Sequence, residues 1–290
     1  MDKCSFDSFE KKKDYLICID SDGCAMDTMD IKHKHCFGPC MVKEWGLAEH
    51  EKEVLDIWNE VNLYTMTRGT NRFKGLLLTM GLCEERGICS VSGYEDISDW
   101  AKNAKALSNT TLKEEIERRE REGGDPSALK KALEWSVKTN ECIAALPEEE
   151  MLPFPGMIEK LEKMHEAADI AVVSSANPEA VKSEWNRHGL ISHIDIMLTQ
   201  EVGPKSYCIK KMLEYGYDSD KVIMIGDAPG DRKSAEKAGV KFFPILVRHE
   251  AESWEKFMKD GIVKFTSGSY DDSYQTEVNI EFEKDLGKLD

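Results

Sequence analysis

The sequence lacks long apolar runs, an excess of positive charge and a regular cysteine motif. No stretch approaches the roughly 18 consecutive apolar residues that a membrane-spanning helix needs. Acidic residues outnumber basic residues by 55 to 39, which gives a net charge of −16. Because like charges repel, this acidity disfavours binding to nucleic acid or to an anionic membrane surface through general electrostatics. We therefore expect neither kind of partner, and no pattern in the sequence indicates an oligomeric state.

The nine cysteines form an odd-numbered set that contains no CxxC motif. Several lie inside apolar runs, as Cys18 does between Ile17 and Ile19. This usage is more typical of a reducing compartment than of a disulfide framework. The first 13 residues are polar and lack the apolar segment of a secretory signal. We therefore predict a cytoplasmic protein whose cysteines are not organised as a disulfide framework.

Apolar residues make up 41% of the chain, which is ample for a core, and they are arranged in two ways. Short runs rich in Ile and Val are typical of strands that are covered on both faces. These runs are residues 15–19, 170–173, 194–198, 222–225 and 242–247. Amphipathic helical segments separate the last four runs, and this alternation predicts a doubly wound parallel α/β sheet. The first run has no neighbour nearby in the sequence, so it must join the sheet from far away.

The intervening part of the chain, residues 27–149, contains almost no Val or Ile clusters and shows helical periodicity. We predict that it forms an all-helical cap domain inserted into a discontinuous α/β core. That core would comprise residues 1–26 and 150–290. Its last segment, residues 266–290, has no pattern that assigns it a function.

Three local patterns carry weaker predictions. Ser92 and Glu95 have the spacing of a capping box, which predicts a helix start. Residues 267–274 are polar and predict a loop. Residues 33–36 contain His and Cys side chains of the kinds that bind zinc, but their spacing fits no standard zinc motif, so we favour incidental placement.

Polar residues follow the predicted strands, where parallel α/β sheets place their ligands. They are Asp20 and Asp22, Ser174 and Ser175, Lys205, and Asp227 and Asp231. Each motif alone has a structural alternative: an acidic turn, a helix cap or a surface lysine. Their joint occurrence in this order makes a coincidence of structural motifs improbable.

The chemistry of this set indicates a phosphate site. Paired carboxylates can divide the work of a nucleophile and a general acid/base. Hydroxyl and N–H groups at a helix start bind anions. A lysine at a helix start is disfavoured by the helix dipole unless an anion holds it. Four carboxylates at one sheet edge would repel one another, and Mg²⁺, which prefers oxygen ligands, would relieve this repulsion.

These motifs resemble those of the haloacid dehalogenase superfamily of hydrolases, in its phosphatase form with a long helical cap. The resemblance covers residues 14–24 and roughly 153–248 and implies a Rossmann-like core. It also implies that Asp20 is the nucleophile that forms an aspartyl-phosphate and that Asp22 is the general acid/base. The implied phosphate ligands are Ser174, Ser175 and Lys205, and the implied Mg²⁺ ligands are Asp20, Asp22 through its backbone carbonyl, Asp227 and Asp231.

The resemblance predicts a Mg²⁺-dependent phosphatase that hydrolyses a small phosphorylated metabolite, without revealing which one. A phosphomutase or phosphotransferase on the same scaffold is an alternative, and so is a non-catalytic phosphometabolite-binding protein. Within the cap, Arg68 and Arg72 lie in a Gly-containing loop ahead of an apolar helix. They could bind a second anionic group of the substrate, or they could serve only in helix capping and an exposed ion pair.

Overall fold

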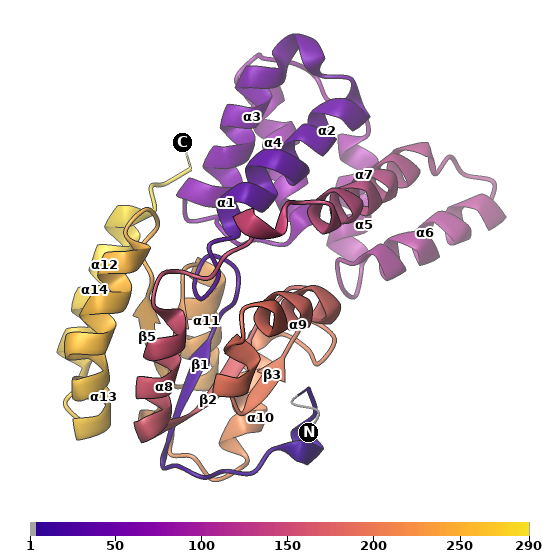
Figure 1. Ribbon diagram of the computed structural model, residues 1–290. Helices are drawn as coiled ribbons and strands as arrows, with labels where there is room; N and C mark the ends of the chain where they lie inside the picture. Colours follow the sequence, from indigo (N-terminus) through magenta and orange to yellow (C-terminus); the bar gives the residue numbers. More distant parts are fainter. Residues whose placement is uncertain (1–3, 290) are drawn as a thin grey trace. The chain divides into compact units, whose positions relative to one another are not determined.

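A computed structural model describes residues 4–289 of the chain. These residues form two compact units (Figure 1), which we treat separately. The core unit contains residues 4–29 and 148–287, and the helical unit contains residues 30–147 together with residues 288 and 289. Of the helices in the described part of the chain, none combines the length and the apolar character needed to cross a membrane.

The core unit is built on a five-stranded sheet in which every neighbouring pair of strands is parallel. Its strand order is β3-β2-β1-β4-β5. The strands are β1 (Tyr15–Ile19), β2 (Ala168–Val173), β3 (Ile196–Leu198), β4 (Val222–Gly226) and β5 (Lys241–Pro244). Ile17 of β1 pairs with Ile170 on one side and with Ile223 on the other. The five apolar runs therefore form the five strands, and the run that is isolated in the sequence is the central strand.

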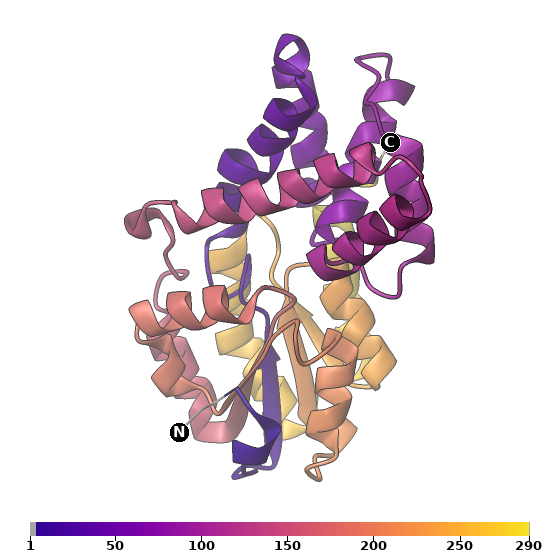
Figure 2. The same cartoon turned by 90° about the vertical axis from the view of Figure 1, so that its right-hand side faces the viewer.

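Helices cover both faces of this sheet (Figure 2), which confirms the predicted doubly wound α/β class. They are α8 (Met157–Ala167), α9 (Pro178–Arg187), α10 (Lys205–Leu213), α11 (Pro229–Ala238), α12 (Glu250–Lys256), α13 (Ile262–Ser267) and α14 (Asp272–Asp285). Local sequence fixes several of their ends. At α9 the Asn177 side chain accepts hydrogen bonds from two first-turn N–H groups, and Pro178 occupies the first turn. Gly239 ends α11 in the left-handed conformation.

The helical unit contains α1 (Met29–Lys32, whose first residue belongs to the core unit), α2 (Gly38–Trp45), α3 (Glu51–Asn59), α4 (Arg72–Glu85), α5 (Tyr94–Asn103), α6 (Asn109–Arg121) and α7 (Ser127–Ala144). Two π-helical turns, His33–Phe37 and Glu60–Tyr64, extend α1 and α3. The unit has its own apolar core, which includes four buried tryptophans. These are Trp45, Trp58, Trp100 and Trp135. Among the side chains of residues 33–36, the His33 ring accepts a hydrogen bond from the Trp58 indole at 3.1 Å.

Two local predictions need a correction. The helix start predicted at Ser92 and Glu95 is confirmed, since α5 begins at Tyr94, but the capping box is not formed. Gly93 precedes the helix at φ +90°, and the Ser92 carbonyl accepts a hydrogen bond from the Trp45 indole. The predicted loop at residues 267–274 is too long, because α14 already begins at Asp272. The Asp271 side chain caps this helix by accepting the Tyr274 N–H at 3.0 Å.

The prediction for the cysteines also needs a correction. Cys36 and Cys142 form a disulfide with a Cα–Cα distance of 5.5 Å, although 106 positions separate them in the chain. The π-helical turn at His33–Phe37 packs against α7, and this packing brings the two residues together. The free thiols include Cys18, Cys24, Cys40, Cys83, Cys89 and Cys208.

Candidate active site

The candidate site lies at the carboxyl ends of the parallel strands. Asp20 directly follows β1, and Asp227 directly follows β4. Because β1 and β4 are neighbours, these two residues emerge side by side, where the strand order changes direction. The Asp20 N–H donates to the carbonyl of Ile225 at 3.0 Å, which continues the strand pairing to the site itself.

Three carboxylates gather at this edge. One carboxylate oxygen each from Asp20, Asp227 and Asp231 lie within 4.8 Å of one another, and all three residues are buried. Asp231 lies in the first turn of α11, and its Oδ2 accepts the Ala228 N–H at 3.1 Å. A Cβ atom at Gly226 would collide with the Asp231 carboxylate, so a residue without a side chain is required there.

Lys205 links two of these carboxylates. It is the first residue of α10, and its Nζ lies 2.6 Å from Oδ2 of Asp20 and 2.6 Å from Oδ1 of Asp231. Burial disfavours the charged form of Lys205, but Asp20 and Asp231 outweigh this effect and raise the pKa of the lysine above its ordinary value. Burial also raises the pKa of Asp20, and its neighbours Asp231 and Asp227 raise it further, against the opposing effect of Lys205.

The charges of this cluster fit a divalent cation. Three buried carboxylates and one lysine lie together here, so these four groups carry a formal net charge of −2. Gathering like charges in a buried site is costly. A hard divalent cation takes carboxylate oxygens as ligands and would supply two positive charges. The donor set therefore suits a metal such as Mg²⁺.

Asp22 lies outside the three-carboxylate cluster, in the loop after β1. Its Oδ1 accepts a hydrogen bond from the buried hydroxyl of Thr28 at 2.5 Å, and its side chain is half-buried. Gly23 permits the sharp turn of this loop, because it adopts φ +79° and donates its N–H to the Met26 carbonyl at 2.8 Å. A role for Thr28 could not be predicted, because a threonine six positions after an aspartate in a loop is no recognisable sequence signal.

The two serines occupy the turn between β2 and α9. Ser174 is buried at the end of β2, and its hydroxyl accepts the Ala176 N–H at 3.1 Å. Ser175 is exposed. Both follow a strand that neighbours β1, so they lie at the same sheet edge as Asp20. The hydrogen bond of Ser174 stabilises the turn, and the prediction that these residues bind phosphate stays a prediction.

Comparison with known families decides the class of protein. The family model described as haloacid dehalogenase-like hydrolase matches residues 93–245, more than half of the chain. The chain belongs to the haloacid dehalogenase-like hydrolases. The matched segment includes Ser174, Lys205, Asp227 and Asp231, whereas Asp20 and Asp22 precede it. Membership of this family confirms the predicted resemblance and the prediction of a hydrolase.

Solved structures resemble this haloacid dehalogenase-like hydrolase in fold. A candidate haloacid dehalogenase-like hydrolase from Bacteroides fragilis has a TM-score of 0.50 at 12% identity, over 80% of this chain and 87% of its own. A haloacid dehalogenase-like family protein from Streptococcus pneumoniae has a TM-score of 0.49 at 15% identity, over 79% and 83%. A candidate phosphoglycolate phosphatase from Lactobacillus delbrueckii has a TM-score of 0.47 at 16% identity, over 80% and 85%. A comparison with curated proteins found no match.

In the helical unit of this hydrolase, the two predicted substrate-binding arginines make contacts within the unit. Arg68 is buried, and its guanidinium donates to the Leu63 carbonyl at 2.9 Å. Arg72 donates to the Ser136 hydroxyl at 3.0 Å and to the Asn140 side chain at 2.7 Å. These contacts suit a structural role, and substrate binding by either arginine stays a prediction.

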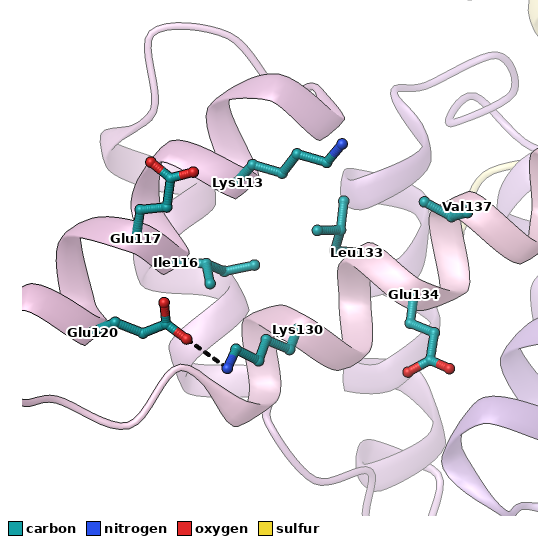
Figure 3. Close-up of a pocket in the computed structure, with 8 residues that line it drawn as sticks. All are labelled: Lys113, Ile116, Glu117, Glu120, Lys130, Leu133, Glu134 and Val137. Carbon is teal, nitrogen blue, oxygen red and sulfur yellow. Dashed lines mark ion pairs between the residues drawn. The ribbon is translucent and has the colours of Figure 1, made fainter.

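A pocket of about 470 Å³ lies between α6 and α7 of the helical unit (Figure 3). Its apolar lining comes from Ile116, Leu133 and Val137, and charged side chains of both signs surround them. One pair of these, Glu120 and Lys130, is joined at 2.6 Å. None of the predicted site residues lines this pocket, so the candidate site remains the carboxylate cluster of the core unit.

Proposed function

We propose that this hydrolase is a Mg²⁺-dependent phosphatase that acts on a small phosphorylated metabolite. The observation that carries the proposal is the cluster of Asp20, Asp227 and Asp231 with Lys205 bound between two of them. This arrangement provides a nucleophile, a fixed positive charge and the ligands for a metal within one buried site. Catalysis of phosphoryl transfer needs mainly such positioning and charge neutralisation.

In the proposed reaction, an Asp20 carboxylate oxygen attacks the phosphorus atom, and the bond from phosphorus to the ester oxygen breaks. Asp22 donates a proton to the departing alcohol oxygen. Asp22 then removes a proton from a water molecule, whose oxygen attacks the aspartyl-phosphate and releases inorganic phosphate and free Asp20. The half-buried position of Asp22 and its hydrogen bond from Thr28 support this division of labour, since a proton-transfer group needs access and a fixed orientation.

Lys205, Ser174 and the N–H of Ser175 would bind the oxygens of the transferring phosphoryl group. Asp20, Asp227 and the backbone carbonyl of Asp22 would hold Mg²⁺, and Asp231 would support them. When bound, Mg²⁺ neutralises the negative charge that these carboxylates and the phosphoryl group bring together. The helical unit, which joins the core between β1 and α8, would act as the cap that selects the substrate.

The test is a phosphate-release assay across sugar phosphates, nucleotides and phospho-acids, with Mg²⁺ and with EDTA. We expect Mg²⁺-dependent release from at least one class, and a loss of about 10³-fold or more in Asp20→Asn. Asp218→Asn, which changes an exposed aspartate of the same unit, is the matched control and should retain activity. Full turnover by Asp20→Asn would exclude the mechanism, and transfer to a sugar hydroxyl in place of phosphate release would favour a phosphotransferase.

A further inference from the structure

Two tryptophans of the core unit donate hydrogen bonds to the loop that carries Asp20 and Asp22. The indole N–H of Trp185, on α9, donates to the Ser21 hydroxyl oxygen at 2.9 Å. The indole N–H of Trp254, on α12, donates to the Cys24 carbonyl at 2.9 Å. Both side chains are fully buried, so water cannot replace either bond.

The first of these bonds reaches the nucleophile through one residue. Ser21 is fully buried, and its backbone N–H donates to Oδ1 of Asp20 at 2.7 Å. The Ser21 carbonyl accepts the N–H groups of Ala25 at 3.0 Å and Met26 at 2.8 Å. Ser21 is therefore the point where the backbone of the loop, the Asp20 carboxylate and the Trp185 indole meet.

The second bond fixes the other end of the same turn. Cys24 follows Gly23, the residue with positive φ, and its carbonyl is held by Trp254 from a different helix. Trp185, Trp254 and Cys24 belong to one apolar cluster on one face of the sheet. A buried indole N–H normally finds an acceptor, but here both acceptors belong to one five-residue segment that contains both aspartates. Packing of the two tryptophans alone does not explain why both of their acceptors lie in this segment.

We propose that Trp185 and Trp254 are positioning residues for the reaction: their two indole hydrogen bonds fix the Asp20–Cys24 loop and thereby aim the carboxylates of Asp20 and Asp22. The inference rests on the proposed phosphatase function. Displacement of a reacting group by about 1 Å can lower the rate by about 10²-fold, so full turnover requires these two fixed donors.

The kinetic test uses Trp185→Phe, Trp254→Phe and Ser21→Ala with p-nitrophenyl phosphate and Mg²⁺. Phenylalanine keeps an aromatic ring but removes the donor, and Ser21→Ala removes the acceptor but keeps the N–H that binds Asp20. We expect each variant to lower kcat about tenfold, with little change in KM, at a temperature where it is fully folded. The control is Phe265→Leu, which removes a buried ring of the same cluster that contacts Tyr15. It should lower Tm and leave kcat unchanged.

A double-mutant cycle separates positioning from loss of packing. Because Trp185 and Ser21 share one hydrogen bond, the Trp185→Phe/Ser21→Ala enzyme should be about as active as either single variant. If kcat of the double variant fell about 100-fold, the product of the two single losses, the assignment of Trp185 would be overturned. Equal losses of kcat in Phe265→Leu and the tryptophan variants would overturn the assignment of both tryptophans.

An NMR measurement tests the same bonds without turnover. The indole N–H resonances of Trp185 and Trp254 are assigned by their disappearance in the two phenylalanine variants. Ser21→Ala should shift the Trp185 resonance strongly, and Mg²⁺ with inorganic phosphate should shift both in the wild-type chain. An unchanged Trp185 resonance in Ser21→Ala would overturn the proposed bond. If these shifts occur but neither wild-type nor variants release phosphate, the phosphatase proposal fails while the loop contacts stand.

Discussion

At the scale of single residues, Thr28 offers a direct test of Asp22 as the general acid. Thr28→Val keeps the shape of the side chain but removes the hydroxyl that holds the Asp22 carboxylate. We expect kcat/KM, which reports the steps up to formation of the aspartyl-phosphate, to fall about tenfold for an alkyl phosphate, because its alkoxide leaving group needs a proton. The loss should be much smaller for p-nitrophenyl phosphate, because p-nitrophenolate leaves without a proton.

The matched control for this prediction is Thr28→Ser, which keeps the hydroxyl and should keep the activity on both substrates. The measurement is kcat/KM for the two phosphates under identical Mg²⁺ concentrations, because kcat also contains the hydrolysis of the aspartyl-phosphate, which both substrates share. An equal loss of kcat/KM on both substrates in Thr28→Val would contradict proton donation by a positioned Asp22, since the leaving group would then make no difference.

Lys205 provides a second prediction, which concerns stability and metal binding together. Lys205→Gln leaves the buried carboxylates of Asp20 and Asp231 without their fixed counter-charge. We expect the free energy of unfolding to fall by about 3 kcal/mol or more in EDTA, because removing one partner of a buried ion pair leaves uncompensated charge. Mg²⁺ should restore part of this loss, and it should stabilise the variant more than the wild-type chain.

Urea unfolding of the wild-type chain and the variant, each with Mg²⁺ and with EDTA, measures these differences. Lys205→Arg, which keeps the charge, is the conservative comparison and should lose less stability than Lys205→Gln. A Lys205→Gln chain that is as stable as the wild type in EDTA would argue against a charged cluster at this site.

These residues also show what the sequence could and could not predict about the site. Asp20, Asp227, Asp231 and Lys205 were predicted because parallel strands deliver the residues after them to one edge. The contacts of Thr28, Ser21 and the two tryptophans could not be predicted. They depend on how side chains pack in three dimensions, and the indole of Trp185 meets a residue 164 positions away.

At the scale of elements, the five strands were predictable because continuous Ile and Val runs are rare outside buried sheets. The ends of helices were less predictable, because several local groups compete for each one. At α5 the Ser92 and Glu95 side chains form no capping box, because Gly93, in the left-handed conformation, is the residue that precedes the helix. At α14 the Asp271 cap and the buried positions Tyr274, Val278 and Phe282 extend a helix into a segment that looked like a loop.

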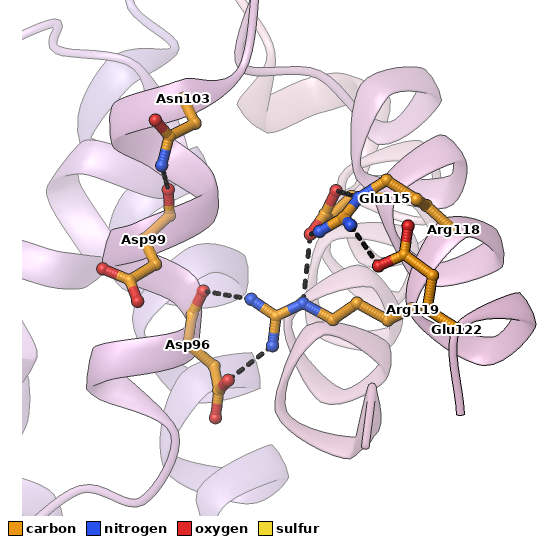
Figure 4. Close-up of polar contacts among 7 residues, drawn as sticks. All are labelled: Asp96, Asp99, Asn103, Glu115, Arg118, Arg119 and Glu122. Atoms are coloured by element: carbon orange, nitrogen blue, oxygen red, sulfur yellow. Dashed lines mark hydrogen bonds and ion pairs between the residues drawn. The ribbon is translucent and has the colours of Figure 1, made fainter. Parts of the chain in front are cut away.

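A prediction at this scale concerns the ion pairs of α6 (Figure 4). Glu115 accepts hydrogen bonds from Arg118 and Arg119, and Arg119 also pairs with Asp96 of α5. The hydrogen bonds from Arg118, followed by the one from Arg119, lower the pKa of Glu115 from 4.5 to about 2. A lowered carboxylate pKa stabilises the folded state above the unfolded pKa, and this contribution is lost as the pH falls through the folded pKa.

Glu115→Gln should therefore lower the free energy of unfolding by about 1 kcal/mol or less at pH 7, since these pairs are only partly buried. The difference from the wild type should shrink as the pH is lowered from 5 towards 2, and it should also shrink at high salt. Urea unfolding followed by tryptophan fluorescence measures it. Glu114→Gln, an exposed position on the same helix, is the control. A difference that stays constant with pH would contradict the assigned ion pairs.

At the scale of the whole molecule, we expect reduction of the disulfide to affect the stability of the helical unit and not that of the core unit. The Cys36–Cys142 bond closes nearly the whole helical unit, because the two cysteines lie close to its first and last residues. The core unit has no disulfide among its described residues. This bond escaped prediction because the sequence gives no spacing rule for a pair 106 positions apart.

Closing so long a loop removes much of the conformational entropy of the unfolded helical unit. We expect reduction, or the substitution Cys36→Ser with Cys142→Ser, to lower the stability of that unit by about 4 kcal/mol. Calorimetry of the full chain should then show a lower Tm for one transition, while the transition of the core unit stays in place.

Cys89→Ser, which removes a free thiol of the helical unit, is the control and should respond to reductant as the wild type does. The entropy effect of the disulfide acts only on the segment that it closes, so reductant should change the Tm of one transition alone. Equal shifts of both Tm values, or no shift of either, would contradict a disulfide that constrains the helical unit separately.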